Sequence, residues 1–128
     1  MSATDLCHCG ELQSLSECCG RFMAGTMEAE TAEQLMRSRY SAYVERDEAY
    51  LMASWHPATR PSRVRLDPDQ RWLGLSVKSV EAGQVEDSRG TVEYVARYKV
   101  QGRGHRLHEI SRFERIGDRW YYRDGEHR

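Results

Sequence analysis

The four cysteines are the residues whose type and spacing most plainly allow chemistry. Cys7, Cys9, Cys18 and Cys19 all fall within the stretch CHCGELQSLSECCG, and the rest of the 128-residue chain contains none. A disulfide framework would spread its cysteines along the chain in order to join distant segments. Two close pairs on a short loop can instead supply four sulfur ligands to a tetrahedral zinc ion. Redox or disulfide chemistry at these thiols is the alternative that the spacing leaves open.

A zinc ion held by four thiolates would be structural, because such a shell has no open position for water or a substrate. His8 lies between two of the cysteines and could replace one of them. Four thiolates already satisfy the metal, so we expect the His8 ring to face solvent. Gly10 and Gly20 each follow a cysteine pair, where a loop that wraps around a metal often needs a positive φ angle.

The pattern C-x-C-x8-C-C followed by glycine resembles the SEC-C motif, the zinc-binding tail of the SecA translocation ATPase. The resemblance implies that Cys7, Cys9, Cys18 and Cys19 are zinc ligands. It also implies that residues 1–22 form a zinc knuckle, which presents a small rigid surface to a protein partner. The counterpart on SecA is understood to do this with a chaperone or the ribosome.

Composition excludes several classes of protein. Nineteen basic and twenty acidic side chains leave a net charge of −1, so no global basic field favours nucleic acid. The mean hydropathy is −0.79, and no apolar run approaches the ~20 residues of a membrane helix. The segment MSATDLCHCG lacks the basic and apolar regions of a signal peptide. We therefore expect a cytoplasmic domain that does not enter a membrane.

Two helices are predicted in the first half of the chain. Thr31 and Gln34 have the pattern of a capping box, and apolar residues then recur at helical spacing up to Val44, with Arg39 on the polar side. Asp47 can cap a second helix, which should end just before Pro57. A loop with a short extended piece at residues 64–66 should follow.

After residue 70 the apolar period changes from that of a helix to that of a strand. Apolar residues alternate in residues 73–77, 92–100 and 107–113, and Val80 breaks the phase, which predicts a bulge near Lys78. Gly117-Asp118 predicts a tight hairpin that pairs residue 116 with 119 and 113 with 122. Helices followed by an antiparallel meander predict an α+β fold, with the helices packed on one sheet face.

The turn between the second and third strands decides the register of the sheet. A turn of even length at residues 101–104 pairs Tyr94 with Ser111 and keeps every apolar position on one face, which we prefer. A turn of three residues would instead pair Arg97 with Glu109.

The whole chain resembles the YchJ-type family of bacterial proteins, which joins a SEC-C motif to a nuclear-transport-factor-2-like (NTF2-like) domain. The segments that carry the resemblance are CCGRF, TAEQLMRSRYSAYV, SWHP, HEISRF and DRWYYRDG. It implies that residues 31–128 form a helix-backed curved sheet, shaped as a cone with an open mouth. Domains of this fold commonly dimerise through the sheet, so the resemblance also implies a homodimer. It implies no particular activity, since none is established for the family.

Such a cone could hold a pocket. Glu109 sits on an otherwise apolar strand face, and a carboxylate in a partly desolvated cone has a raised pKa, as a general base or acid requires. A buried glutamate that only accepts structural hydrogen bonds is the alternative. The pocket candidates are His56, Tyr94, Tyr98, Glu109, Ser111 and Tyr122.

Three functions follow from these features. The first is a non-enzymatic adaptor, in which a structural zinc knuckle binds a protein partner. The second is a small-molecule binder or small enzyme that uses the pocket around Glu109. The third is a nucleic-acid or ribosome-associated binder that uses the knuckle and nearby arginines, which the net charge of −1 disfavours.

Overall fold

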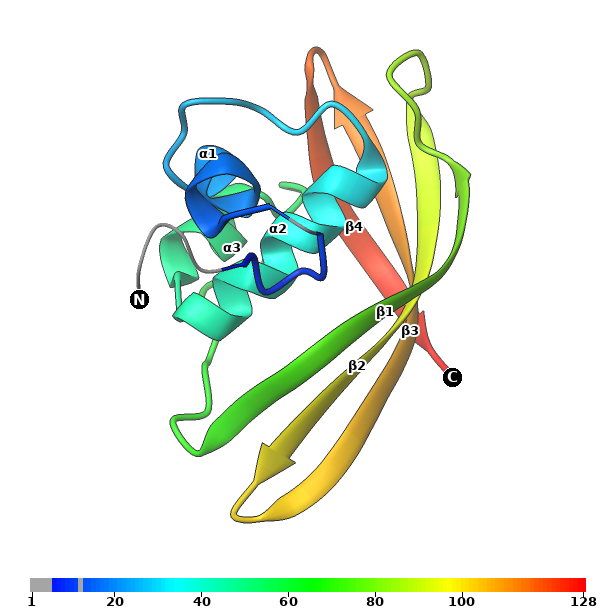
Figure 1. Cartoon of the computed structure of the whole chain (residues 1–128). Coiled ribbons are helices and arrows are strands. Elements are labelled where there is room, and N and C mark those ends of the chain that lie inside the picture. The colour runs from blue at the N-terminus through cyan, green and yellow to red at the C-terminus, as the bar shows by residue number, and fades with distance from the viewer. Residues whose placement is uncertain (1–5, 12) are drawn as a thin grey trace.

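Residues 6–11 and 13–128 are described by the structure, which is a computed structural model (Figure 1). Residues 1–5 and Leu12 of the predicted knuckle therefore lie outside the described residues. The helical elements are η1 (Leu15–Glu17), α1 (Cys19–Met23), α2 (Ala32–Glu45) and α3 (Glu48–Ala53). The strands are β1 (Gln70–Ala82), β2 (Arg89–Val100), β3 (Arg103–Ile116) and β4 (Arg119–His127). They form one antiparallel sheet in the order β1-β2-β3-β4, which confirms the predicted α+β fold.

Both predicted helix caps are present. The Thr31 hydroxyl accepts a hydrogen bond from the Gln34 backbone N–H at 3.1 Å, and the Gln34 side chain accepts one in return from the Glu30 N–H at 2.8 Å. The Asp47 carboxylate accepts from the Tyr50 N–H at 3.0 Å and so begins α3. Each cap satisfies N–H groups that the first turn of a helix leaves without a partner. Residues 64–66 belong to the loop between α3 and β1 and pair with no strand of the sheet.

The β2–β3 turn differs from the prediction. Only Gln101 and Gly102 form the turn, both with positive φ (51° and 81°), as a two-residue hairpin of this kind requires. The predicted four-residue turn is therefore wrong, and Tyr94 lies opposite Glu109 rather than Ser111. Since both turns have an even length, the same side chains still share a face. The β3–β4 hairpin pairs residue 116 with 119 and 113 with 122, as predicted.

Strand β1 contains two bulges where one was predicted. The register shifts between Val77 and Ser79, as the phase break had indicated, and also between Trp72 and Gly74. The second bulge turns Leu73 away from the core and leaves it 57% exposed. Trp72 takes the inward position instead, where its ring packs against Tyr40 and Tyr43 of α2.

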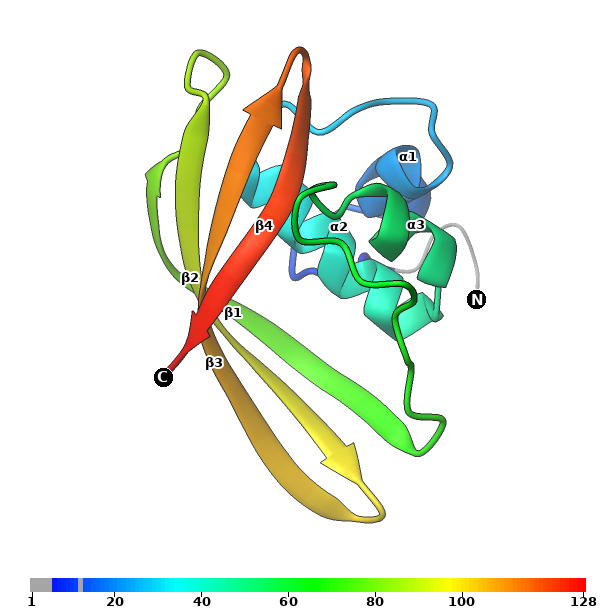
Figure 2. The ribbon, with the colours of Figure 1, turned by 180° about the vertical axis from the view of Figure 1, so that it is seen from behind.

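The helices cover one face of the strongly curved sheet (Figure 1, Figure 2). The other face is open, and the end of the sheet where β2 turns into β3 extends past the helical layer in both views. The core between the two layers is formed by Phe22, Ala29, Ala32, Leu35, Met36, Tyr40, Val92, Ala96, Phe113 and Trp120. No helix in the described part of the chain is long and apolar enough to cross a membrane.

The segment after α3 covers the outer edge of β4. The Tyr122 backbone donates to the Ser54 carbonyl at 2.9 Å and accepts from the His56 N–H at 2.7 Å. The Thr59 hydroxyl also donates to the Arg123 carbonyl at 2.5 Å. The edge of β4 is therefore hydrogen-bonded along this stretch. The same bonds place Trp55 beside Tyr122, at the wall of the cone.

We predict that Gly90→Ala lowers the free energy of unfolding by about 2 kcal/mol, because a Cβ at residue 90 would overlap the backbone of Gly83 and lie 3.3 Å from the Ala32 side chain. Urea denaturation measures the effect. Gly104→Ala is the matched control, because a Cβ there would meet nothing within 4 Å. Equal losses of stability in the two variants would contradict the close packing at Gly90.

Candidate functional site

The sulfur atoms of the four cysteines converge. The Sγ atoms of Cys7, Cys9, Cys18 and Cys19 all lie within 4.8 Å of one another, and all four side chains are buried. The Sγ atoms of Cys9 and Cys18 are 3.7 Å apart, whereas a disulfide bond is about 2.05 Å long. Sulfur atoms at ~2.3 Å from a tetrahedral zinc ion are about 3.8 Å apart. The cluster therefore has the size and burial of a metal site.

A small hairpin holds the first cysteine pair. The Cys7 N–H donates to the Gln13 carbonyl at 2.8 Å, and Leu6 pairs with Ser14 in an antiparallel bridge. Gly10 makes the turn with a φ of 95°, as expected for a residue that follows the pair.

Gly20 serves a different purpose from the one predicted. It lies inside α1 and is not among the residues with a positive φ. A Cβ at this position would lie only 2.6 Å from the Leu15 carbonyl oxygen, so the glycine allows η1 and α1 to approach. This close approach brings the second cysteine pair back toward the first.

Side chains of helix α2 contact the cysteine loop and hold it in place. Arg37 donates from Nη1 to the Cys9 carbonyl at 2.6 Å, and the Ser41 hydroxyl lies 3.5 Å from the Cys7 sulfur. The His8 Nε2 lies 2.7 Å from a carboxylate oxygen of Glu45. His8 is not part of the sulfur cluster, and its partly exposed ring joins the loop to the end of α2.

The electrostatics of the cluster favour a bound cation. Burial is the main cause that raises the pKa of the Cys18 thiol, and the neighbouring Cys9 and Cys7 raise it further. At neutral pH this thiol would keep its proton unless a positive charge stabilised the thiolate. A divalent metal ion supplies that charge and would allow all four sulfur atoms to act as ligands.

A second site lies inside the cone, where a cavity of about 370 Å³ opens between α2 and the sheet. Four of the pocket candidates line it: Tyr94, Glu109, Ser111 and Tyr122. Burial is the main cause that raises the pKa of Tyr94 and Tyr122 above the ordinary value, so both phenols stay protonated at neutral pH. The cavity therefore combines aromatic walls with hydroxyl donors.

Glu109 is buried in this cavity, at 6% exposure, and its carboxylate accepts three hydrogen bonds. Ser111 donates to Oε2 at 2.5 Å and Tyr122 to the same oxygen at 3.3 Å. The exposed ring of His127 lies 2.9 Å from Oε1. Gly125 on β4 makes room for this carboxylate, because a Cβ there would overlap it.

Arg39 is the buried cation of the same cavity. Its guanidinium packs against the rings of Trp55 and Tyr122, at 5.0 Å and 4.6 Å from their centroids. Nη1 donates to the Leu51 carbonyl at 2.8 Å and to the Ser54 hydroxyl at 2.6 Å, both neutral acceptors. No carboxylate of the described residues forms an ion pair with Arg39.

Two pocket candidates lie outside the cavity. The His56 ring accepts a hydrogen bond at Nδ1 from the Ala58 N–H at 3.0 Å and packs near Tyr121, so it shapes the turn after α3. Tyr98 stacks on His105 with ring centroids 5.1 Å apart, near the end of the sheet. Both were pocket candidates, and neither is among the residues that line the cavity.

Arg39, Trp55 and His127 also line the cavity, and their amino-acid pattern had not predicted this. Arg39 was expected on the solvent-facing side of α2, but that side of the helix is buried in the structure. His127 was missed because the register of β4 shifts opposite Arg112 and Phe113, which reverses the alternation after Tyr122. The pattern of the amino acids carries no signal for that reversal.

A cysteine cluster docked against a helix-backed cone defines a class: proteins in which a SEC-C motif precedes an NTF2-like domain. Two solved structures share this arrangement. RPA3114 from Rhodopseudomonas palustris, a SEC-C motif containing protein, is 34% identical with a TM-score of 0.83, over 95% of this chain and 98% of that one. A SEC-C motif containing protein from Psychrobacter arcticus is 26% identical with a TM-score of 0.79, over 95% and 82%.

The family is defined by sequence. The family model for the YchJ middle NTF2-like domain matches residues 31–125. The UPF0225 protein SCO1677 of Streptomyces coelicolor is 50% identical over 123 residues, 96% of each chain. The UPF0225 protein BPP1723 of Bordetella parapertussis is 47% identical over 128 residues, 98% of this chain and 95% of that one. This chain belongs to the YchJ family of UPF0225 proteins, as the resemblance had indicated.

Proposed function

We propose that this protein is a zinc-binding, non-enzymatic adaptor. In this proposal residues 1–22 form a structural zinc knuckle that binds a protein partner, and residues 31–128 form the domain that carries it. The observation that carries the proposal is the convergence of four buried cysteine Sγ atoms within 4.8 Å. Cys7, Cys9, Cys18 and Cys19 would be the ligands, and zinc is the metal that suits four thiolates in a reducing cytoplasm.

The surroundings of the cluster support a structural role. Four thiolates would complete the coordination of zinc and leave no position for a substrate. The loop has little apolar core of its own, so the metal would supply most of its folding energy. The hydrogen bond from the Arg37 side chain to the Cys9 carbonyl would then hold the folded loop against α2.

The outer surface of the loop is what a partner would meet. While its sulfur atoms point inward, Leu6 is 60% exposed and Glu11 and Gly10 are also exposed. An exposed apolar side chain on a small rigid loop is a suitable anchor for a protein interface, because such contacts dominate binding energy when they are buried.

We predict one zinc ion per chain in protein purified without chelator, and a Cys9→Ser variant that loses the metal on dialysis. Elemental analysis measures the metal, and a thiol reagent should find all four cysteines unreactive until the metal is stripped. Glu17→Gln, an exposed change in the same loop, should keep the zinc.

Hydrogen exchange then tests the two units of the proposal. Removing the metal should deprotect the amides of residues 6–23 and leave those of β2 and β3 protected. Freely reactive thiols without metal would overturn the zinc proposal. Equal loss of protection in the sheet would overturn the division into two units.

For the adaptor role, the chain offers a matched pair of exposed leucines. Leu6 on the knuckle and Leu73 on the sheet are 60% and 57% exposed. We predict that Leu6→Ala weakens the binding of a captured protein partner at least about tenfold, while Leu73→Ala leaves it unchanged. Calorimetry on the purified pair measures the affinities. A stronger effect of Leu73→Ala would place the interface on the sheet and contradict the adaptor role of the knuckle.

The cavity supports a second candidate function, the binding of a small organic anion. The supporting observation is that Arg39 and Glu109 are both buried in its wall without forming an ion pair. A planar anion could pack against the aromatic walls and receive hydrogen bonds from the guanidinium, which is suited to carboxylates and similar groups. The unpaired positive charge of Arg39 would favour a ligand with a negative group.

The fluorescent anion 1-anilinonaphthalene-8-sulfonate is a probe for this cavity. We predict that Arg39→Gln weakens its binding about tenfold or more, because the cation is lost, whereas Glu109→Gln strengthens it, because a negative charge is removed. His56→Gln is the control, since the ring lies outside the cavity. Fluorescence titration measures the three affinities, and changes of the same sign in Arg39→Gln and Glu109→Gln would contradict an anion site there.

A further inference from the structure

Four basic residues lie next to one another on the sheet face that points away from the helices. Arg71 of β1 lies directly opposite Lys99 of β2, and Arg97 of β2 lies directly opposite Arg106 of β3. Arg97 and Lys99 are two residues apart, so they share a face. All four side chains are exposed. We call Arg71, Arg97, Lys99 and Arg106 the cationic patch.

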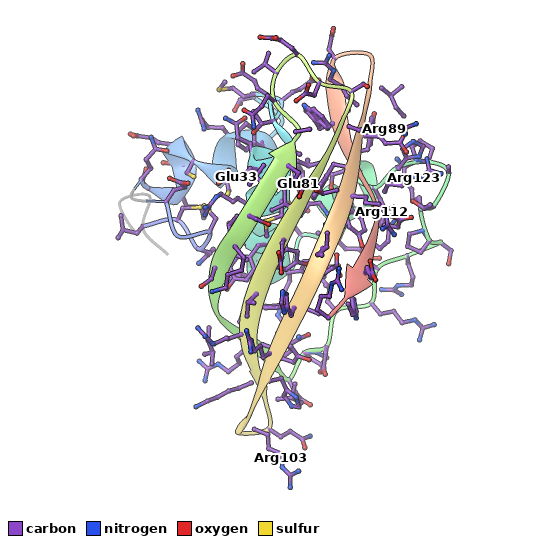
Figure 3. All side chains as sticks on the ribbon, turned by 90° about the vertical axis from the view of Figure 1, so that its right-hand side faces the viewer. Glu33, Glu81, Arg89, Arg103, Arg112 and Arg123 are labelled. Atoms are coloured by element: carbon purple, nitrogen blue, oxygen red, sulfur yellow. The ribbon has the colours of Figure 1, made fainter. Side chains whose placement is uncertain are left out.

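The patch is on the outer face because its neighbours along each strand point inward. Trp72, Tyr98 and Leu107 alternate with the patch residues and pack against the core. Figure 3 shows this outer face, with the helices behind the sheet and Arg103 at the end of the β2–β3 hairpin. That end of the sheet extends past the helical layer (Figure 1).

No acidic side chain of the described residues neutralises the patch. None of its four members takes part in an ion pair or a side-chain hydrogen bond within residues 6–11 and 13–128. Glu93, on the same face of β2, is already engaged by His108 at 2.7 Å and by Ser79 at 3.2 Å. Three arginines and a lysine therefore form an isolated positive region on a chain whose net charge is −1.

Packing does not require these charges. Like charges directly opposite each other on a sheet are destabilising, and exposed uncharged residues would fit at the same positions. The two-residue turn creates the opposition of Arg97 and Arg106, whereas a three-residue turn would have given Arg97 an acidic neighbour in Glu109. The fold thus holds basic groups together in a place where they repel one another, and a bound anion would relieve this repulsion.

We propose that the cationic patch binds the phosphodiester backbone of a nucleic acid, without reading its sequence. Neighbouring strands are about 4.8 Å apart and alternate residues about 6.8 Å apart, so each charge lies within one Debye length, about 8 Å, of its nearest neighbours in the patch. A repeating polyanion matches such an array, and guanidinium groups are well suited to phosphate. A protein partner is less favoured, because protein interfaces are built around an apolar centre and every member of the patch is charged.

Anisotropy titrations of the full-length protein with a labelled 20-nucleotide single strand and with the matching duplex test this proposal. Four phosphate contacts predict a slope of about −2.8 for the single strand in a plot of log K against log salt concentration. The double variant Arg97→Gln/Arg106→Gln should reduce that slope to about −1.4 and weaken binding about 25-fold at 0.1 M salt. Its melting temperature should not fall, because a like-charge pair is removed.

The control is Arg112→Gln/Arg123→Gln, which removes two charges from the same sheet face. Both arginines are already in ion pairs at 2.5 Å, with Asp124 and Glu114, so their loss should change the affinity far less. Figure 3 shows them toward the other end of the sheet.

Several outcomes would overturn the proposal. These are no binding at 50 mM salt, an affinity independent of salt, an equal loss in the control variant, and equally tight binding of poly-glutamate, which would indicate an acidic protein as the partner. If the unchanged protein binds no nucleic acid and the double variant self-associates, the charges instead serve to keep copies of the chain apart. A preference for the single strand or the duplex identifies which form the patch accepts.

Discussion

The middle of helix α2 is buried on every side, and both candidate sites are built against this helix. Residues 38–42 are all buried, a run longer than one helical turn, so no face of the helix is left to solvent there. Arg37 and Ser41 meet the cysteine loop, while Met36 and Arg39 line the cavity of the cone. Any displacement of this helix would therefore change the geometry of the cysteines and of the cavity together.

The burial of α2 also explains its polar residues. Small hydroxyl side chains can pack closely, and a buried polar group must find a partner inside the protein. The Ser38 hydroxyl meets the Tyr50 hydroxyl at 2.6 Å and donates to the Leu35 carbonyl at 2.7 Å. Arg39 bonds to the end of α3, where the carbonyl groups of a helix attract a cation. These bonds join α2 to α3, and they hold the guanidinium at the wall of the cone.

Local patterns predicted much of the fold. The helix caps at Thr31 and Asp47, the helix-to-strand change and the β3–β4 hairpin all follow from short-range rules, and the cysteine spacing pointed to the sulfur cluster. The failures share a cause, which is that long-range packing decides them. Arg39 lies on the polar side of α2, which local periodicity predicts to face solvent and which the segment after α2 buries. Leu73 turned outward because a second bulge lets Trp72 fill the inner position.

The two edges of the sheet differ in how they are closed. Along β4 the backbone is occupied by Ser54 and His56 of the chain itself. Along β1 the bulges at Leu73 and Lys78 interrupt the regular spacing of N–H and carbonyl groups. An incoming strand from another molecule would find no long, straight row of partners at either side. The protein is thereby protected against strand-by-strand growth into fibrils, and contacts with other molecules are directed to its faces.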